Sequence, residues 1–170
     1  ESWVFTFAAH PRSILAPDAK ISLLMTTESR IAAFQSLGFH GICLIDFDAE
    51  IASLSPTSFV TSLAKVFPAL EKIVCGENWR FGKDGTGTPN FLTSCAQKRH
   101  WQVTPVPTSV IDGIPVSSTR IRKAVACGDF SLASALLGRP YSISGIVMHG
   151  RQVGSKAGIP TANISTEGLA

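Results

Sequence analysis

The sequence is poor in charge and lacks several patterns that would assign it to a large class of proteins. Only 16% of its 170 residues are charged, and the net charge is +3. It has no dense lysine and arginine stripe of the kind that nucleic-acid-binding proteins show. No apolar run approaches the length of a membrane span, and residues 1–9 lack the basic start of a signal peptide. We therefore expect a cytoplasmic protein that binds neither nucleic acid nor membrane.

The cysteines give no sign of a metal or redox centre. The four of them, Cys43, Cys75, Cys95 and Cys127, include no pair at Cys-x-x-Cys spacing. Cys43 and Cys75 lie in apolar, strand-like runs. We interpret all four as small buried or part-buried hydrophobic residues in a reducing cytosol.

What the sequence has is a regular alternation of strand and helix patterns. Hydrophobic residues make up 45% of it, enough for a real core. The run Ile42-Cys43-Leu44-Ile45 is apolar throughout, as in a strand buried on both faces of a parallel sheet. The alternation predicts an α/β fold with a doubly wound parallel sheet, whose ligands would lie at the carboxyl ends of the strands. The expected strands are 3–7, 42–45, 72–75 and 101–106, and the expected helices begin near Thr26, Ser55 and Asn90.

The pattern changes after Val116. Ser117-Ser118-Thr119 can cap a helix that runs to about Cys127, and a second helix is expected at 132–137. Residues 141–148 then alternate in polarity, which indicates a half-buried antiparallel strand. We place a domain boundary near residues 138–140.

Ser117 to Arg122 is the first candidate for a ligand site. Hydroxyl groups at a helix start lie where backbone N–H groups and the positive end of the helix dipole favour an anion. Arg120 and Arg122 add guanidinium groups, which hold phosphate in a bidentate way. The alternative is an ordinary helix cap with surface arginines.

The segment Gly76-Glu77-Asn78-Trp79-Arg80-Phe81-Gly82, directly after a strand, is the second candidate. Glycine lets a backbone approach a ligand, an asparagine can hydrogen-bond a heterocycle or phosphate, and aromatic rings could stack on a flat ligand. The alternative is a turn with aromatic packing. We expect the glycine-rich stretch 82–89 to be flexible.

The remaining candidates are weaker. The segment 154–163 offers Thr161 and Asn163 as oxygen ligands for Mg²⁺, or is a hairpin turn. His10 follows a strand and either binds phosphate or is a loop histidine. Asp46 and Asp48 end a strand in the region where ligands bind, but they show no partner, and we interpret them as solvated loop residues.

These segments together resemble one family, the bacterial bifunctional riboflavin kinase/FMN adenylyltransferases, or FAD synthetases. Residues 76–82 resemble the family's Gly-x-Asp/Asn-aromatic-x-Phe-Gly segment, and residues 117–122 its Ser-Ser-Thr-x-Ile-Arg motif. Residues 136–141 resemble the junction between its two modules, and residues 158–163 the Pro-Thr-Ala-Asn motif of riboflavin kinases. The resemblance covers nearly the whole chain.

The resemblance implies a nucleotidyltransferase-type α/β domain at 1–138 and the beginning of a small antiparallel β-barrel, the riboflavin kinase module, at 139–170. The first would join FMN to the AMP part of ATP, and the second would phosphorylate riboflavin, with Mg²⁺. The implied nucleotide-binding residues are His10, Asn78, Ser117, Ser118, Thr119 and Arg122; Gly76, Asn78, Arg80 and Phe81 form the flavin-side loop, and Thr161 and Asn163 bind the metal.

The chain departs from the family pattern at its start. The family begins with a strand and a Gly-x-Phe-Asp-Gly-x-His-x-Gly-His segment, whose histidines serve adenylyl transfer and which is not among these residues. Ala9 also replaces the first proline of the family's Pro-His-Pro loop. No catalytic residue is therefore assigned, and we expect a chain truncated at both ends. The alternatives are a non-catalytic flavin- or nucleotide-binding remnant and a nucleotidyltransferase for another substrate; residues 160–163 argue against the latter.

Overall fold

The computed structural model describes residues 1–16, 18, 22–148, 162–165 and 169. By their internal packing they divide into two compact units. The first comprises Glu1–Thr6, Ala19–Ile45 and Ser117–Ala170, and the second comprises Phe7–Asp18 and Asp46–Val116. Each unit is described by itself below.

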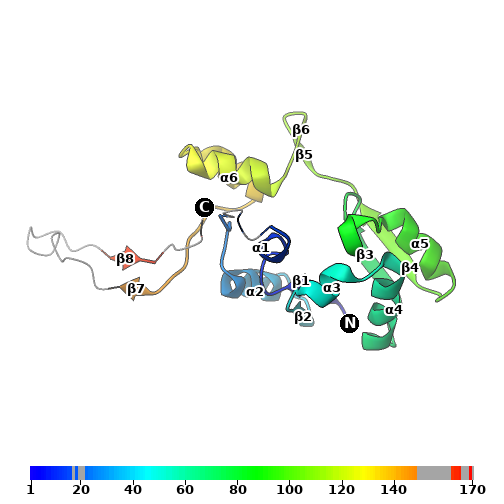
Figure 1. The fold of residues 1–170 in the computed structure, drawn as a ribbon. Helices are drawn as coiled ribbons and strands as arrows, with labels where there is room; N and C mark the ends of the chain where they lie inside the picture. Colours follow the sequence, from blue (N-terminus) through cyan, green and yellow to red (C-terminus); the bar gives the residue numbers. More distant parts are fainter. Residues whose placement is uncertain (17, 19–21, 149–161, 166–168, 170) are drawn as a thin grey trace, which may run out of the picture. The chain divides into compact units, whose positions relative to one another are not determined.

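The second unit is built on a parallel strand pair. Strands β3 (Lys72–Gly76) and β4 (Gln102–Val106) lie side by side, with Gly76 opposite Val106 at their carboxyl ends. Helix α5 (Pro89–Gln97) connects them, and α4 (Pro56–Val66) precedes β3 (Figure 1). Both helices begin with proline at the first turn after a hydroxyl cap, a combination that suits a helix start because proline needs no intrahelical acceptor. The unit is thus a strand–helix–strand motif with a parallel register, as the sequence predicts.

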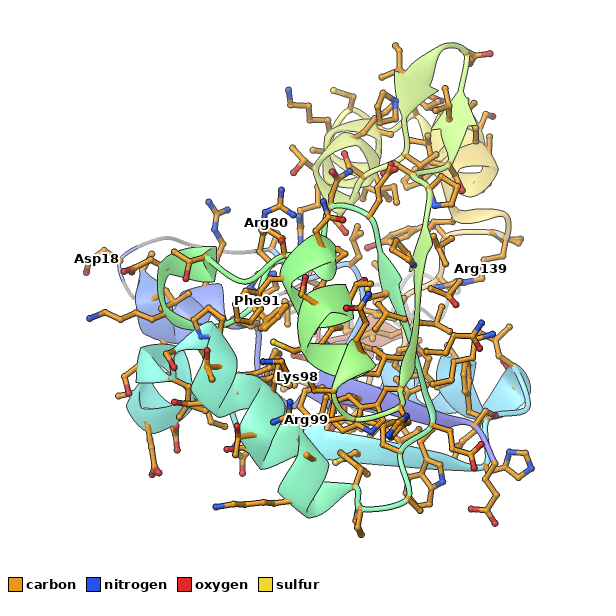
Figure 2. All side chains as sticks on the ribbon, turned by 90° about the vertical axis from the view of Figure 1, so that its right-hand side faces the viewer. Asp18, Arg80, Phe91, Lys98, Arg99 and Arg139 are labelled. Carbon is orange, nitrogen blue, oxygen red and sulfur yellow. The ribbon has the colours of Figure 1, made fainter. Side chains whose placement is uncertain are left out.

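The core of the second unit lies between these helices and the strand pair. Leu92 is fully buried and Val60 is 1% exposed. Phe59 and Phe81 complete the buried cluster, with ring centroids 5.1 Å apart. Phe91 on α5, labelled in Figure 2, packs against the same cluster. This apolar cluster fixes α4 and α5 against one face of the strands and so holds the loops that follow them.

The first unit contains a helix packed on a strand pair and, separately, a pair of packed helices. Helix α2 (Thr27–Ser36) is capped by Thr26 and packs against β2 (Gly41–Ile45), which pairs with β1 (Trp3–Phe7). Helices α6 (Ser118–Ala126) and α7 (Phe130–Leu137) pack on each other. Their contact is made of buried apolar side chains, namely Ile121, Ala124, Ala133 and Leu136. This packing fixes the first turn of α6, where the Ser117 motif lies.

Several short elements were not expected from the sequence. They are α1 (Arg12–Leu15), α3 (Ala49–Ser53), the 3-10 helix η1 (Lys83–Gly85) and a hairpin of β5 (Val110–Ile111) and β6 (Ile114–Pro115). The hairpin turns at Asp112 and Gly113, whose φ angles of 55° and 73° are both positive. That is the mirror-image turn that matches the twist of two short antiparallel strands.

The strands of the described residues form four two-stranded sheets. The α/β class is confirmed, and so is the parallel pairing of β3 with β4. The strand expected over 141–148 is shorter: only β7 (Val147–Met148) is extended, and it pairs antiparallel with β8 (Asn163–Ile164). None of the helices in the described part of the chain is long and apolar enough to cross a membrane.

Candidate functional site

The first turn of α6 carries the predicted anion motif. Ser117 is its cap, because the Ser117 Oγ accepts a hydrogen bond from the Arg120 N–H at 3.2 Å. Ser118 and Thr119 occupy the next two positions and are exposed. Their N–H groups belong to the turn that has no intrahelical acceptor. Ser117 therefore has a structural role as the cap of α6, and Ser118 and Thr119 are exposed in the first turn of that helix.

Arg122 is tied to a distant segment of the same unit. Its Nε–H donates to the backbone carbonyl of Ser22 at 2.6 Å. A guanidinium has further N–H donors on its terminal nitrogens, and a bond at Nε restricts the plane in which those donors lie. Arg122 is thus a part-buried cation with a constrained orientation, one helical turn beyond the cap.

The carboxyl ends of β3 and β4 hold a polar cluster. Asn78 Nδ2 donates to Thr108 Oγ1 at 2.9 Å, and the Thr108 N–H donates to Glu77 Oε1 at 2.7 Å. The Glu77 N–H also donates to the Val106 carbonyl at 2.9 Å, which extends the parallel ladder beyond Gly76. The two strand-end loops are therefore joined by hydrogen bonds at the edge of the sheet where ligands of α/β proteins bind.

Glu77 is held in its ionised form by these contacts. Hydrogen bonds from the Thr108 backbone N–H and then from the Thr108 side chain lower the pKa of Glu77, against a small opposing effect of burial. A carboxylate accepts hydrogen bonds and cannot donate them. The bonds therefore favour the negative form, which completes the cluster.

Gly76 leaves open space above the strand end. A methyl group built on its Cα would meet no atom within 4 Å, and its φ angle is not positive. The chain itself therefore does not require glycine at this position. Close approach of a ligand to the backbone is one reason to have glycine at such a place.

The aromatic residues of the 76–82 segment belong to the core. Phe81 is 6% exposed, and its ring stacks on that of Trp79 with centroids 4.6 Å apart. Trp79 in turn packs on Phe59. The idea that these rings stack on a flat ligand is wrong for Phe81, because its faces are used inside the protein. Arg80, labelled in Figure 2, is exposed and donates from Nη1 to the Trp79 carbonyl at 2.9 Å.

The glycine-rich stretch after Phe81 is a hydrogen-bonded turn rather than the flexible loop expected. Phe81 and Gly87 exchange two backbone hydrogen bonds, of 3.2 and 2.8 Å. Gly82 has a φ of +71°, and a Cβ there would lie 2.8 Å from the backbone nitrogen of Pro56. Gly82 allows the turn to pack closely on the start of α4, and Gly87 allows it to pack on the Phe81 ring. Packing within the protein therefore explains why glycine occupies both positions.

His10 lies just before α1 in the second unit. Its Nδ1 accepts a hydrogen bond from the Arg12 N–H at 3.2 Å, and its carbonyl accepts one from the Ser13 hydroxyl at 2.7 Å. Acceptance at Nδ1 places the proton of the neutral ring on Nε2. His10 thus stabilises the local turn through its Nδ1 atom and its carbonyl oxygen.

The acidic and sulfur-containing residues have local explanations. Asp48, expected to be a solvated loop residue, caps α3: its Oδ1 accepts from the Ile51 N–H at 2.8 Å. All four cysteines are free. Burial raises the pKa of Cys75. Cys127 is exposed, which corrects the expectation of burial, because α6 ends at Ala126 and directs this residue to solvent.

The structure describes one of the two predicted metal ligands. Thr161 lies outside the described residues, and Asn163 is an exposed residue of β8. Across the ranges that the structure describes, no three histidine, cysteine, aspartate or glutamate side chains gather as a metal site would require. Most of the 154–163 segment likewise lies outside those ranges.

One open hollow of about 510 Å³ lies in the first unit, along α2. It is lined by Met25, Glu28 and Ser29 from the start of that helix and by Arg139 and Ser142 from the segment after α7. None of the residues that the sequence predicts for a ligand site lines it. We assign no ligand to this hollow.

Sequence reasoning missed Thr108, and it included Glu77 in a candidate segment without giving it a role. Thr108 lies two residues beyond the end of β4, as Asn78 lies two beyond the end of β3. Because the strands are in register, with Gly76 opposite Val106, the two side chains meet. That equivalence was present in the sequence, but it is visible only once the two strands are known to be parallel neighbours.

Comparison with known proteins gives a consistent result for this α/β chain. A sequence model described as FAD synthetase matches residues 1–120, and one described as riboflavin kinase matches residues 137–170. The first match spans both the strand-end cluster and the cap of α6. The chain belongs to the FAD synthetase family.

Individual relatives agree with this family. The chain is 32% identical over 96% of its length to a bifunctional riboflavin kinase/FMN adenylyltransferase of Pseudomonas fluorescens, and 34% identical over 95% to that of Listeria monocytogenes. It spans about half of each relative, 52% and 51%. A crystal structure described as a macrolide-efflux protein from Streptococcus pneumoniae has a TM-score of 0.79 at 31% identity, over 96% of this chain and 53% of that one.

Proposed function

We propose that the protein carrying this chain transfers the AMP part of ATP to FMN, forming FAD and pyrophosphate, and that it also phosphorylates riboflavin to FMN. The observation that carries the proposal is the match of the FAD synthetase model to residues 1–120. The curated relatives are described by the same two activities. The riboflavin kinase match at 137–170 supports the second reaction.

In this proposal the start of α6 binds ATP phosphates. Ser118 and Thr119 offer exposed hydroxyl and N–H donors at the positive end of a helix. Arg122 adds a cation whose plane is restricted by its bond to Ser22. Ser117 contributes the cap that shapes this turn. His10, in the second unit, is proposed separately as a nucleotide-binding residue.

The strand-end loop would serve the flavin and nucleotide side. Asn78 offers a side-chain amide at the carboxyl end of β3, and Gly76 leaves room for a ligand against the backbone. Arg80 adds an exposed positive charge. Phe81 contributes through the core that fixes this loop, not by stacking on the ligand.

The chemistry proposed is an in-line displacement without a covalent enzyme intermediate. A phosphate oxygen of FMN attacks the α-phosphorus of ATP, a new P–O bond forms, and the bond to pyrophosphate breaks. The protein's part is to align the two substrates and to stabilise the negative charge that develops on the phosphates. Donors at a helix start and a fixed guanidinium suit that part.

The finer architecture is also a proposal. We propose that residues 1–138 form a nucleotidyltransferase-type domain with a doubly wound parallel sheet, for which the β3–β4 register is the visible support. Residues 139–170 would begin the antiparallel barrel of the kinase module, which the β7–β8 pairing supports. We place the protein in the cytoplasm, where its free cysteines would stay reduced.

Mg²⁺ is the metal proposed for the kinase module. Thr161 and Asn163 offer a hydroxyl and an amide oxygen, a donor set of the hard type that this ion prefers. When bound, the ion would neutralise phosphate charge. Asn163 is exposed on β8, so its side chain can be reached from solvent.

The test combines titration and turnover. The protein is titrated with ATP and with FMN by calorimetry, and is then incubated with both substrates and Mg²⁺, and separately with riboflavin, ATP and Mg²⁺, while the flavin products are separated and quantified. Formation of FAD and FMN supports the enzyme. Binding of both ligands without product would favour the alternative, a non-catalytic flavin- or nucleotide-binding member of the family. Failure to bind either ligand would contradict both.

A further inference from the structure

Thr108 occupies a special place in the strand-end cluster. Asn78 and Thr108 are each two residues past the end of a strand, on neighbouring parallel strands whose last residues, Gly76 and Val106, are paired. Their side chains are joined by the 2.9 Å hydrogen bond from Asn78 Nδ2 to Thr108 Oγ1. The bond links residues 30 positions apart in the sequence, so it depends on the tertiary fold.

A chain of hydrogen bonds gives the Asn78 amide one orientation. The Glu77 carboxylate accepts from the Thr108 N–H at 2.7 Å, and this bond holds the Thr108 backbone beside the end of β3. The Thr108 hydroxyl oxygen is the acceptor for Asn78 Nδ2 at 2.9 Å. An amide nitrogen donates and an amide oxygen accepts, so this bond distinguishes the two ends of the Asn78 side chain. The Nδ2 group of Asn78 therefore faces Thr108, and its Oδ1 is left to face elsewhere.

We propose that Thr108 is a positioning residue that fixes the Asn78 amide for ligand binding, with Glu77 fixing Thr108 in turn. The inference rests on the proposed function, in which Asn78 contacts a nucleotide or flavin. It also specifies the contact: the Asn78 carbonyl oxygen is an acceptor, so it pairs with a donor group of the ligand, such as a sugar hydroxyl or a ring amine. An ionised phosphate oxygen could pair only with the second Nδ2 proton of Asn78, not with this carbonyl oxygen.

Exposure agrees with these two roles. Asn78 and Glu77 are exposed, whereas Thr108 is half-buried between the two loops. A ligand can therefore reach Asn78, while the less exposed Thr108 holds the Asn78 side chain by its hydrogen bond. The adjacent Gly76 leaves the ligand side of the strand end open.

The first part of the test needs no ligand. In the free protein, the side-chain NH₂ group of Asn78 is followed by NMR in the wild type and in Thr108→Val, which removes the hydroxyl and keeps the shape. We expect its proton signals to move and its exchange with solvent to quicken. Thr61→Val is the matched control, since the Thr61 hydroxyl bonds only the local Thr57 carbonyl. Unchanged Asn78 signals in Thr108→Val would overturn the proposal.

The second part is a double-mutant cycle on ligand affinity. Loss of one hydrogen bond should weaken binding of FMN or ATP about 2- to 12-fold in Thr108→Val. The same change made in an Asn78→Ala background should have no further effect, and Thr108→Ser should restore affinity. An equal loss in both backgrounds would mean that Thr108 does not act through Asn78.

The two possible failures can be told apart. If the wild type binds neither FMN nor ATP, the proposed function fails and this inference fails with it. If the wild type binds and the cycle shows no coupling, only the role of Thr108 is refuted.

Discussion

Arg122 and Ser22 are joined by a 2.6 Å hydrogen bond between the guanidinium Nε–H and a backbone carbonyl, across 100 positions of sequence. The bond explains how a side chain near the start of α6 keeps a constrained orientation although it is not fully buried. A flexible arginine would lose more conformational entropy on binding phosphate than one that is already held. The constraint is therefore relevant to the proposed ATP site.

Replacing Arg122 by lysine should separate charge from geometry. Arg122→Lys keeps the positive charge but loses the planar fork and the Nε bond to Ser22. We expect ATP affinity to fall about ten-fold, the size of a lost charged hydrogen bond. Arg99→Lys is the control, since the Arg99 guanidinium lies over the Trp101 ring and has no part in the proposed site. Calorimetry measures both, and an ATP affinity unchanged in Arg122→Lys would remove Arg122 from the site.

The serines at the start of α6 should respond differently to alanine. Ser117→Ala loses the cap on the Arg120 N–H and should destabilise the protein by about 1 kcal/mol. Ser118→Ala removes an exposed hydroxyl and should leave stability within about 0.5 kcal/mol while it weakens ATP binding. Denaturant unfolding and ATP titration of both variants make the comparison. Equal stability losses, with ATP binding untouched by Ser118→Ala, would count against the assigned roles.

Gly76 and Gly82 form a similar contrast. Gly76→Ala adds a methyl group into open space, so stability should change by less than about 0.5 kcal/mol, while a ligand lying on this backbone would bind more weakly. Gly82→Ala should destabilise by about 1–3 kcal/mol, because its φ is positive and the new Cβ would meet Pro56. Thermal unfolding and flavin titration distinguish them. Full flavin affinity in Gly76→Ala would exclude close contact at that strand end.

The lowered pKa of Glu77 gives a pH dependence with a definite sign. A carboxyl whose pKa is lower in the folded protein contributes stability above its unfolded pKa of about 4.3, and the contribution disappears as pH falls through the folded value. Glu77→Gln should therefore be less stable than the wild type at pH 7, with the difference shrinking toward pH 3. Thermal unfolding across this range measures it, with the exposed Glu71→Gln as control. A difference that does not change with pH would refute the assignment.

Helix starts were predictable from the sequence because capping is local. Thr26 and Ser55 cap α2 and α4 where the pattern placed them, and Gly38 follows the C-cap of α2 with a φ of +79°. The hairpin was equally predictable, because Asp112-Gly113 is a dipeptide that favours the two-residue turn between antiparallel strands. Asp48 is an exposed loop residue as expected, and it also caps α3, a role that the sequence analysis did not assign to it.

The site was predictable only as separate segments. The motif at 117–122 and the loop at 76–82 were identified by their residues, yet the roles within them needed packing. The Phe81 ring is buried against Phe59 and Trp79, which its sequence position does not reveal. Thr108 becomes relevant only through its bond to Asn78, which depends on strand register. Long-range pairing of this kind is not encoded in any one stretch of the chain.

The most direct test of the account follows the phosphorus atoms of ATP. The protein carrying this chain is incubated with FMN, Mg²⁺ and ATP labelled at either the α- or the γ-phosphorus, and the flavin and pyrophosphate are separated. We predict that the α-label appears in FAD and the γ-label in pyrophosphate, in equal amounts, with both reduced in Arg122→Lys. Absence of α-label from the flavin product, in a protein that binds both substrates, would contradict adenylyl transfer.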